Sequence, residues 1–481
     1  MKQGHAANVF WSGLEAAVSA LLSFASAFIV ARLVGPAEVG IGAAAIALHV
    51  LLWVSVNALF ADALVQRGVM EDDTFSSAFV ASIAVGCIAA LLQAGFGSPL
   101  AWSLADNRLI MMSVVLALPL PLVGAAGPVQ GLLTRNRAYR TLAWRTIIGQ
   151  GLGTLTGVVS ALLGAGAWAL VLQQVVISGA GALTLLLRCP LPPRRRVSTQ
   201  RLREMLRIGL PLTASTLVQH GRYRLFALLI GGTAGAAALG QVHMAFRLVD
   251  AVRELAFTAQ WRLMLPVLSE HQKEPSALRA SMDRCLTWSS FLAFPLCAGM
   301  AVVIQPLVAS LLGPAWVSCG EAALPLIALT AWLFLAFPAG VAVIARGEAR
   351  YTLIANIAGT VATAAGVLLL RPATPLQAVL VWLGAQVFVS PYVLWANAHV
   401  LGTTPLRPIR AGVPLLAASL LASIAAFVLP QAMMAELQSP VSLMALRLLI
   451  AIAVGVPAAL LLSTAPSGMF RRARANAALQ R

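Results

Sequence analysis

The sequence predicts an all-α polytopic membrane protein with about 14 transmembrane helices. Its 481 residues are 60% hydrophobic and only 10% charged, whereas an average soluble protein carries about 25% charged residues. Apolar runs long enough to span a bilayer recur along the chain, and arginines gather in every second connection between them. This composition excludes a soluble globular enzyme and also a disordered chain, which needs low hydrophobicity and high charge.

The apolar runs, taken in order, define the predicted helices. A helix needs roughly 20 apolar residues to cross the hydrocarbon core. The runs lie at about residues 9–33, 38–62, 75–97, 109–132, 144–164, 168–187, 208–231, 237–261, 285–308, 321–345, 352–370, 377–398, 412–430 and 441–463. A basic, Pro-rich stretch at 188–207 separates the sixth run from the seventh. No connection is long enough to fold as a domain outside the membrane.

The basic residues predict the orientation in the membrane. When the connections are sorted alternately, one set holds about 25 basic residues, including both lysines, and the other holds only Arg32, Arg108 and Arg371. Cytoplasmic connections carry an excess of Lys and Arg, so we expect a multi-pass protein of the cell inner membrane with both termini in the cytoplasm. The sorting places Arg145 in a cytoplasmic connection. The same rule explains the net charge of +17 by basic residues in cytoplasmic loops, so this charge does not indicate nucleic-acid binding.

A weak internal repeat predicts two related bundles. Leu33–Gly35 ends the first run with Leu-Val-Gly, and Leu229–Gly231 ends the seventh with Leu-Ile-Gly. Transporters are often built from such repeats. The predicted parts are an N-terminal six-helix bundle at 1–187, a basic cytoplasmic linker at 188–207, a C-terminal six-helix bundle at 208–398, and an extra helix pair with a basic cytoplasmic tail at 399–481.

Charged residues within the predicted helices mark the candidate site, because charges at membrane depth generally face a cavity or pair with another group. Four charged residues of the eighth run recur at i, i+3, i+6 and i+7, which places them on one helix face. They are Arg247, Asp250, Arg253 and Glu254. In the seventh run, His220 and Arg224 share a face at i, i+4.

Two interpretations of these residues stay open. In the first, a cationic, water-filled central cavity binds a pyrophosphate, because a guanidinium holds phosphate oxygens through two hydrogen bonds and stays charged. The candidate pyrophosphate-binding residues are Arg224, Arg247, Arg253 and His220, and the candidate ion-coupling residues are Asp250, Glu254 and Glu15. In the second, Arg247–Asp250 and Asp250–Arg253 are internal ion pairs that hold the bundle together.

Several catalytic and metal-binding motifs are absent from the sequence. The only lysines, Lys2 and Lys273, do not follow a glycine, so the chain has no P-loop for ATP. The five cysteines form no CxxC pair, and the six histidines form no HExxH motif. We therefore expect no cofactor, no metal and no enzymatic activity.

Five stretches carry a resemblance to a known family. They are ARLVGPAEVGIGAAA at 31–45, ALVQRGVMEDDTFSSAF at 63–79, LLTRNRAYRTLAWR at 132–145, ALLGAGAWALVLQQ at 161–174 and LLGPAWVSCGEAALPLIAL at 311–329. In their order and spacing the chain resembles the polysaccharide transporter (Wzx-type flippase) family of the multidrug/oligosaccharidyl-lipid/polysaccharide exporter superfamily. The resemblance implies a flippase that moves an undecaprenyl-pyrophosphate-linked oligosaccharide from the inner to the outer leaflet by alternating access, for lipopolysaccharide or exopolysaccharide synthesis.

The resemblance also implies the partners, which are the lipid-linked oligosaccharide, membrane lipids and, as candidates, the polymerase and glycosyltransferases of the same pathway. Two other functions stay open. A drug or cation exporter of the same superfamily would need acidic residues in its cavity more than arginines. A membrane glycan polymerase or glycosyltransferase would need a sizeable external loop with catalytic residues, and the short external loops offer only Glu38, Asp106 and Glu436.

Overall fold

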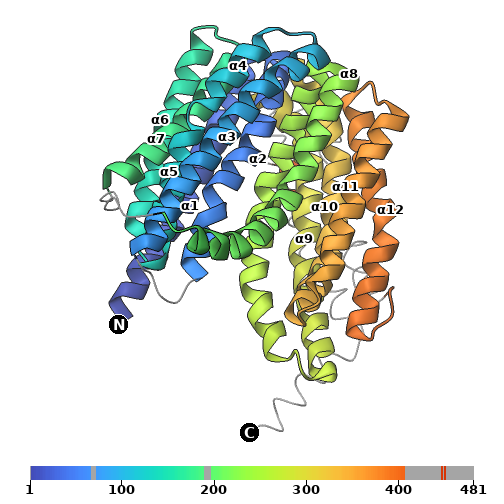
Figure 1. The fold of residues 1–481 in the computed structure, drawn as a ribbon. Coiled ribbons are helices and arrows are strands. Elements are labelled where there is room, and N and C mark those ends of the chain that lie inside the picture. Colours follow the sequence, from blue (N-terminus) through green and yellow to red (C-terminus); the bar gives the residue numbers. More distant parts are fainter. Residues whose placement is uncertain (1, 67–71, 189–196, 407–445, 448, 451–481) are drawn as a thin grey trace. The chain divides into compact units, whose positions relative to one another are not determined.

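The described part of the chain is almost entirely helical (Figure 1). The computed structural model describes residues 2–66, 72–188, 197–406, 446–447 and 449–450. No strand occurs in these ranges, which confirms the predicted all-α class. The last two predicted helices, at about 412–430 and 441–463, lie outside the described residues, apart from the four named last.

Within the described ranges, most helices are long and apolar. Their bounds are α1 Lys2–Val34, α2 Pro36–Gln66, α3 Asp72–Leu104, α4 Arg108–Ala117, α5 Leu120–Arg135, α6 Tyr139–Leu162, α7 Trp168–Arg188, α8 Thr199–Glu270, α9 Pro275–Leu311, the 3₁₀ helix η1 Pro314–Trp316, α10 Val317–Ala345, α11 Ala349–Leu370 and α12 Pro375–Leu401. Ten stretches of the described residues have the length and hydropathy needed to cross a membrane. Large apolar side chains such as Leu91, Leu163 and Leu369 are exposed, as a lipid-facing surface requires.

One predicted helix is divided in the structure, and the break predicted between two others is found inside α8. The predicted fourth helix, at about 109–132, is divided into α4 and α5 by a turn before Leu120, because Pro119 has no N–H to continue the hydrogen-bond ladder. The predicted seventh and eighth helices are the two halves of α8, which bends at Gly235, where φ is 83°. A positive φ favours glycine, so the bend has a local cause.

The helices form two compact units. The first runs to His243 and also contains Thr363–Val381, whereas the second begins at Met244 and lacks that segment. The first unit therefore holds α1–α7 and the N-terminal part of α8. The second holds the C-terminal part of α8 with α9, α10 and most of α11 and α12. The duplication expected from the sequence stays a prediction.

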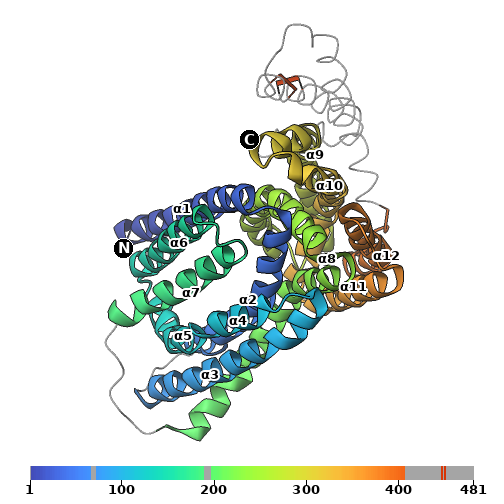
Figure 2. The same ribbon diagram turned by 90° about the horizontal axis from the view of Figure 1, so that it is seen from above.

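A stripe of glycines packs α6 against α7 in the first unit. Gly149, Gly153 and Gly157 are buried at successive i, i+4 positions of α6. A Cβ atom at Gly153 would lie 2.3 Å from the Ile177 side chain, and one at Gly157 would lie 2.5 Å from the Gln173 side chain. Small residues at this spacing let membrane helices approach closely. Figure 2 shows α1, α6 and α7 in succession, and α6 contacts both neighbours.

In the first unit, the backbones of α2 and α8 approach each other closely. A Cβ atom built on Gly40 would lie 1.8 Å from the carbonyl oxygen of Ala236, and one built on Gly240 would lie 1.9 Å from that of Pro36. These separations are far below van der Waals contact, and the obstructing atoms belong to the backbone. Glycine at both positions is therefore what allows the two helices to cross here.

The second unit has an aromatic and polar core where α8, α9 and α10 meet. The ring of Phe257 lies 4.4 Å from that of Phe334 and 4.5 Å from that of Phe337, measured between centroids. Ser289 of α9 donates to Gln260 Oε1 at 2.8 Å, or to the carbonyl oxygen of Phe334 at 3.0 Å. A buried hydroxyl needs such partners because no water reaches it.

Candidate functional site

The charged face predicted in the eighth run lies on the C-terminal half of α8, in the second unit. Arg253 Nη2 lies 2.9 Å from Asp250 Oδ1, and both side chains are about one third exposed, at 27% and 30%. Arg247 is half-buried and Glu254 is exposed. The structure thus brings Asp250 and Arg253 together as an ion pair at i, i+3.

Two other predicted residues, His220 and Arg224, lie on the N-terminal half of α8, in the first unit. The guanidinium carbon of Arg224 lies 5.5 Å from the centroid of the Tyr223 ring. The Tyr223 hydroxyl is hydrogen-bonded to His243 Nδ1 at 2.8 Å. His220 is exposed. The predicted pyrophosphate-binding residues are therefore divided between the two units.

Glu15, the remaining predicted coupling residue, lies on α1 and contacts α6. Its Oε1 accepts a hydrogen bond from the Thr146 hydroxyl at 2.6 Å. Asp250 and Glu254 belong to the second unit and Glu15 to the first. Glu15 is therefore not part of the charged face of α8. Its partner Thr146 lines a cavity that the sequence did not predict.

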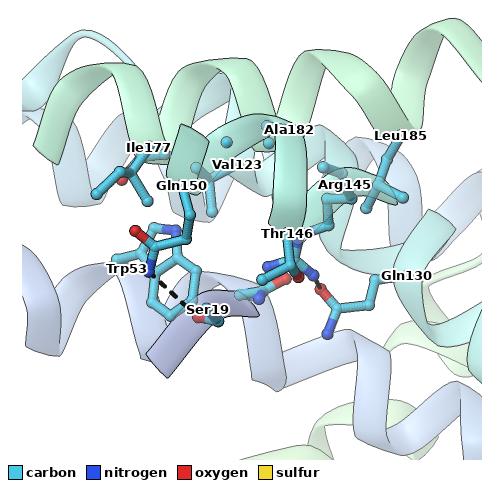
Figure 3. A pocket seen from close by; sticks show the side chains of 15 residues that line it. Ser19, Trp53, Val123, Gln130, Arg145, Thr146, Gln150, Ile177, Ala182 and Leu185 are labelled. Atoms are coloured by element: carbon cyan, nitrogen blue, oxygen red, sulfur yellow. Dashed lines mark hydrogen bonds between the residues drawn. The ribbon is translucent and has the colours of Figure 1, made fainter. Parts of the chain in front are cut away.

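This cavity of about 260 Å³ lies inside the first unit (Figure 3). Five helices contribute to its lining. The lining residues are Ser19 of α1, Trp53 and Asn57 of α2, Val123, Ala126 and Gln130 of α5, Arg145, Thr146, Gly149 and Gln150 of α6, and Ile177, Ser178, Gly181, Ala182 and Leu185 of α7. Several of them are polar and one is charged, and such residues within membrane helices generally face a cavity or one another.

Polar side chains form two groups along the cavity. Near one end, Gln150 Nε2 donates to Ser19 Oγ at 3.4 Å beside Trp53. Near the other, Arg145 Nη1 donates to Gln130 Oε1. The Glu15 carboxylate attracts the Arg145 guanidinium electrostatically.

Arg145 lies within a helix and not in a cytoplasmic connection, so the prediction from the charge distribution was wrong for this residue. Arg145 lies in the second turn of α6, because this helix begins at Tyr139. One signal could have revealed it. Thr146 and Gln150 are polar and lie at i, i+4, so they share a helix face. Arg145 and Gly149 have the same spacing and lie next to them, which predicts a polar face that includes Arg145.

A separate charged cluster joins three connections at one end of the first unit. Arg108 donates to both carboxylate oxygens of Glu38, at 3.1 and 2.8 Å, and to both oxygens of Asp106, at 3.1 Å to Oδ1 and 2.8 Å to Oδ2. Glu38 Oε2 also accepts the backbone N–H of Ala167 at 2.7 Å. The hydrogen bond from Arg108 lowers the pKa of Asp106. Two of the three acidic residues considered for an external enzyme site are thus bound to an arginine.

The described residues offer no candidate metal site, since no group of three or more His, Cys, Asp or Glu side chains gathers among them.

The fold is that of known membrane transporters. It matches the lipid II flippase MurJ in an inward closed conformation with a TM-score of 0.76 and 13% sequence identity, over 96% of this chain and 99% of that one. It also matches an inward-facing multidrug resistance transporter of the MATE family, in the MOP superfamily, with a TM-score of 0.63 and 15% identity, over 81% and 98% of the chains. The chain is therefore a multi-pass membrane protein with a MurJ- and MATE-like transporter fold.

The sequence defines the family within this class. Residues 29–321, more than half of the chain, match the family described as Polysaccharide biosynthesis protein, and the chain belongs to that family. A curated relative, the succinoglycan biosynthesis transport protein ExoT of Rhizobium meliloti (strain 1021), is 26% identical over 313 residues. The match covers 64% of this chain and 63% of the length of that relative. The resemblance drawn from the five sequence stretches is confirmed.

Proposed function

We propose that the protein is a flippase that moves an undecaprenyl-pyrophosphate-linked oligosaccharide from the inner to the outer leaflet of the cytoplasmic membrane. The observation that carries this proposal is membership of a polysaccharide biosynthesis family over residues 29–321. Two similarities support it: the relative ExoT is named as a transport protein for succinoglycan biosynthesis, and MurJ is named as a lipid II flippase. The product would serve lipopolysaccharide or exopolysaccharide synthesis.

In this mechanism, the protein alternates between states open to either side, and arginines bind the pyrophosphate. We assign that binding to four residues of α8, chosen because a planar guanidinium matches phosphate oxygens. They are Arg224, Arg247, Arg253 and His220. The ion pair between Asp250 and Arg253 supports a competition, since a carboxylate that holds the guanidinium keeps it from the phosphate.

Ion coupling follows from the same competition. Protonation of Asp250 would break its ion pair with Arg253, so that Arg253 could bind the pyrophosphate. Deprotonation would restore the ion pair, and the pyrophosphate would dissociate. Asp250 and Glu254 are one turn apart on the same helix, so their carboxylates repel each other when both are ionised. Glu15 is assigned a coupling role beside Thr146. The charge distribution of the connections supports a protein of the inner membrane with both termini in the cytoplasm.

A drug exporter is the second candidate, and the similarity to a MATE transporter is the observation that favours it. A deletion of the gene, complemented by the wild-type copy, distinguishes the two. The flippase proposal predicts loss of surface polysaccharide and accumulation of the lipid-linked oligosaccharide in the inner leaflet. Normal surface polysaccharide together with increased sensitivity to cationic drugs would contradict it and support the exporter.

A further inference from the structure

The cavity of the first unit presents both hydrogen-bond donors and acceptors. Gln130 accepts from Arg145 through Oε1, so its amide N–H groups can donate to another molecule. Gln150 donates to Ser19 through Nε2, so its carbonyl oxygen can accept. A sugar hydroxyl both donates and accepts, whereas a phosphate or carboxylate only accepts. The lining therefore suits hydroxyl groups better than an anion.

The charges around the cavity lead to the same conclusion. Among the described residues that line it, Arg145 alone carries a charge. The Glu15 carboxylate attracts that guanidinium and is held beside the lining by Thr146. An anion brought next to Arg145 would also meet the repulsion of Glu15, because this carboxylate interacts with the same guanidinium. A neutral ligand avoids this repulsion.

The size and the aromatic residue of the cavity indicate a single ring. Its volume of about 260 Å³ lies just below the range of about 300–1,000 Å³ typical of sites for drug-sized ligands, which fits one sugar ring. Trp53 supplies a flat apolar face and an N–H donor. Gly149, Gly181 and Ala182 line the same space with little or no side chain, which keeps room for a ligand.

We infer that this cavity binds one neutral sugar residue, with Trp53 against the ring and with Gln130 and Gln150 hydrogen-bonded to its hydroxyl groups. The identity of that sugar as part of the lipid-linked glycan rests on the proposed function. Recognition of the sugar would then be separate from recognition of the pyrophosphate, which is assigned to α8. Substitutions in the cavity should therefore weaken sugar binding, and substitutions in α8 should weaken pyrophosphate binding.

Ligand-observed saturation-transfer NMR on the full-length protein in detergent micelles tests this inference. The probes are methyl glycosides of glucose, galactose and N-acetylglucosamine, methyl glucuronide, and inorganic pyrophosphate observed by phosphorus NMR. We expect saturation transfer to at least one neutral glycoside. Trp53→Leu and Gln150→Leu should each reduce it about fivefold, as the loss of one ring contact or hydrogen bond predicts. Trp53→Phe keeps an aromatic face and should retain most of the signal.

The matched control is Trp102→Leu, because Trp102 is also a tryptophan of the first unit but is 88% exposed. It should leave the saturation transfer unchanged. The inference is wrong if no neutral glycoside binds, if glucuronide or pyrophosphate alone responds, or if Trp53→Leu and Gln150→Leu bind like the wild type. Flipping of a lipid-linked glycan in liposomes is a separate readout. A wild type that flips but binds no sugar refutes this inference alone, and one that binds sugar but flips nothing refutes the proposed function alone.

Discussion

Gly40 of α2 and Gly240 of α8 lie against each other with backbone in direct contact. The Cβ atom that any other residue would place at Gly40 lies 2.9 Å from the backbone nitrogen of Gly240, and the reverse separation is 3.0 Å. Backbone atoms cannot rotate away as a flexible side chain can. The crossing of α2 and α8 is therefore fixed by these two residues, although they are 200 positions apart in the numbering.

Gly240→Ala should lower the thermal stability of the purified protein, because the new methyl group overlaps the carbonyl oxygen of Pro36. Overpacking of this kind typically destabilises by about 1–3 kcal/mol. The control is Gly151→Ala, since a Cβ atom at Gly151 of α6 meets nothing within 4 Å. That substitution should be neutral or stabilising, because alanine favours helix by about 1 kcal/mol over glycine. Equal melting temperatures for the two variants would contradict the described crossing.

Asp106→Asn should reduce stability at neutral pH but not in acid. Arg108 lowers the pKa of Asp106 in the folded state, so the stabilising contribution is present above the unfolded-state pKa of about 3.9 and is lost as the pH falls through the lower folded-state pKa. Melting temperatures of wild type and Asp106→Asn should differ at pH 7 and converge in acid below about pH 4. A difference that grows on acidification would contradict the sign of this linkage.

Arg247→Ala should abolish export while protein abundance stays near that of the wild type. Loss of a charge-assisted contact to pyrophosphate predicts a decrease of about 10- to 100-fold in flipping rate. Quantitative immunoblotting and a flipping assay measure the two quantities separately. Arg262→Ala is the control, because Arg262 is an exposed arginine of the same helix. Low abundance with a normal rate per molecule would instead indicate a structural role.

The Asp250–Arg253 ion pair leads to a prediction about energy coupling. Asp250→Asn removes the charge that holds the guanidinium, so the flipping rate should no longer respond to an imposed proton gradient. Glu321→Gln removes an exposed carboxylate at the start of α10 and should leave the response intact. Proton, sodium and electrical gradients are imposed separately on liposomes. A response of Asp250→Asn equal to that of the wild type would contradict the coupling role.

Hydropathy alone located the helices well, because a bilayer requires about 20 apolar residues for every crossing. Spacing alone also predicted the Asp250–Arg253 pair, since residues at i, i+3 are neighbours on a helix. Contacts between distant parts of the chain were not predictable in this way. Nothing local in the sequence joins Glu38 to Arg108, which is 70 positions later.

The position of Arg145 shows where charge sorting fails. An arginine near the end of an apolar run can belong to a connection or to the first turns of a helix, and the positive-inside rule treats both alike. The helix α6 begins five residues earlier than the predicted run at about 144–164, which moves Arg145 into the lining of the cavity. The partners Gln130 and Glu15 come from α5 and α1, so only the packing of three helices reveals them.

The most direct test of the proposed function is a flipping measurement in liposomes that contain the purified protein. A fluorescent undecaprenyl-pyrophosphate-linked oligosaccharide is placed in both leaflets, and an impermeant quencher is added outside. The flippase account predicts that wild-type liposomes lose nearly all fluorescence, that protein-free liposomes keep the inner-leaflet half, and that Arg247→Ala liposomes lose this half about 10- to 100-fold more slowly than the wild type. Wild-type liposomes that keep that half under proton, sodium and electrical gradients alike would contradict the account.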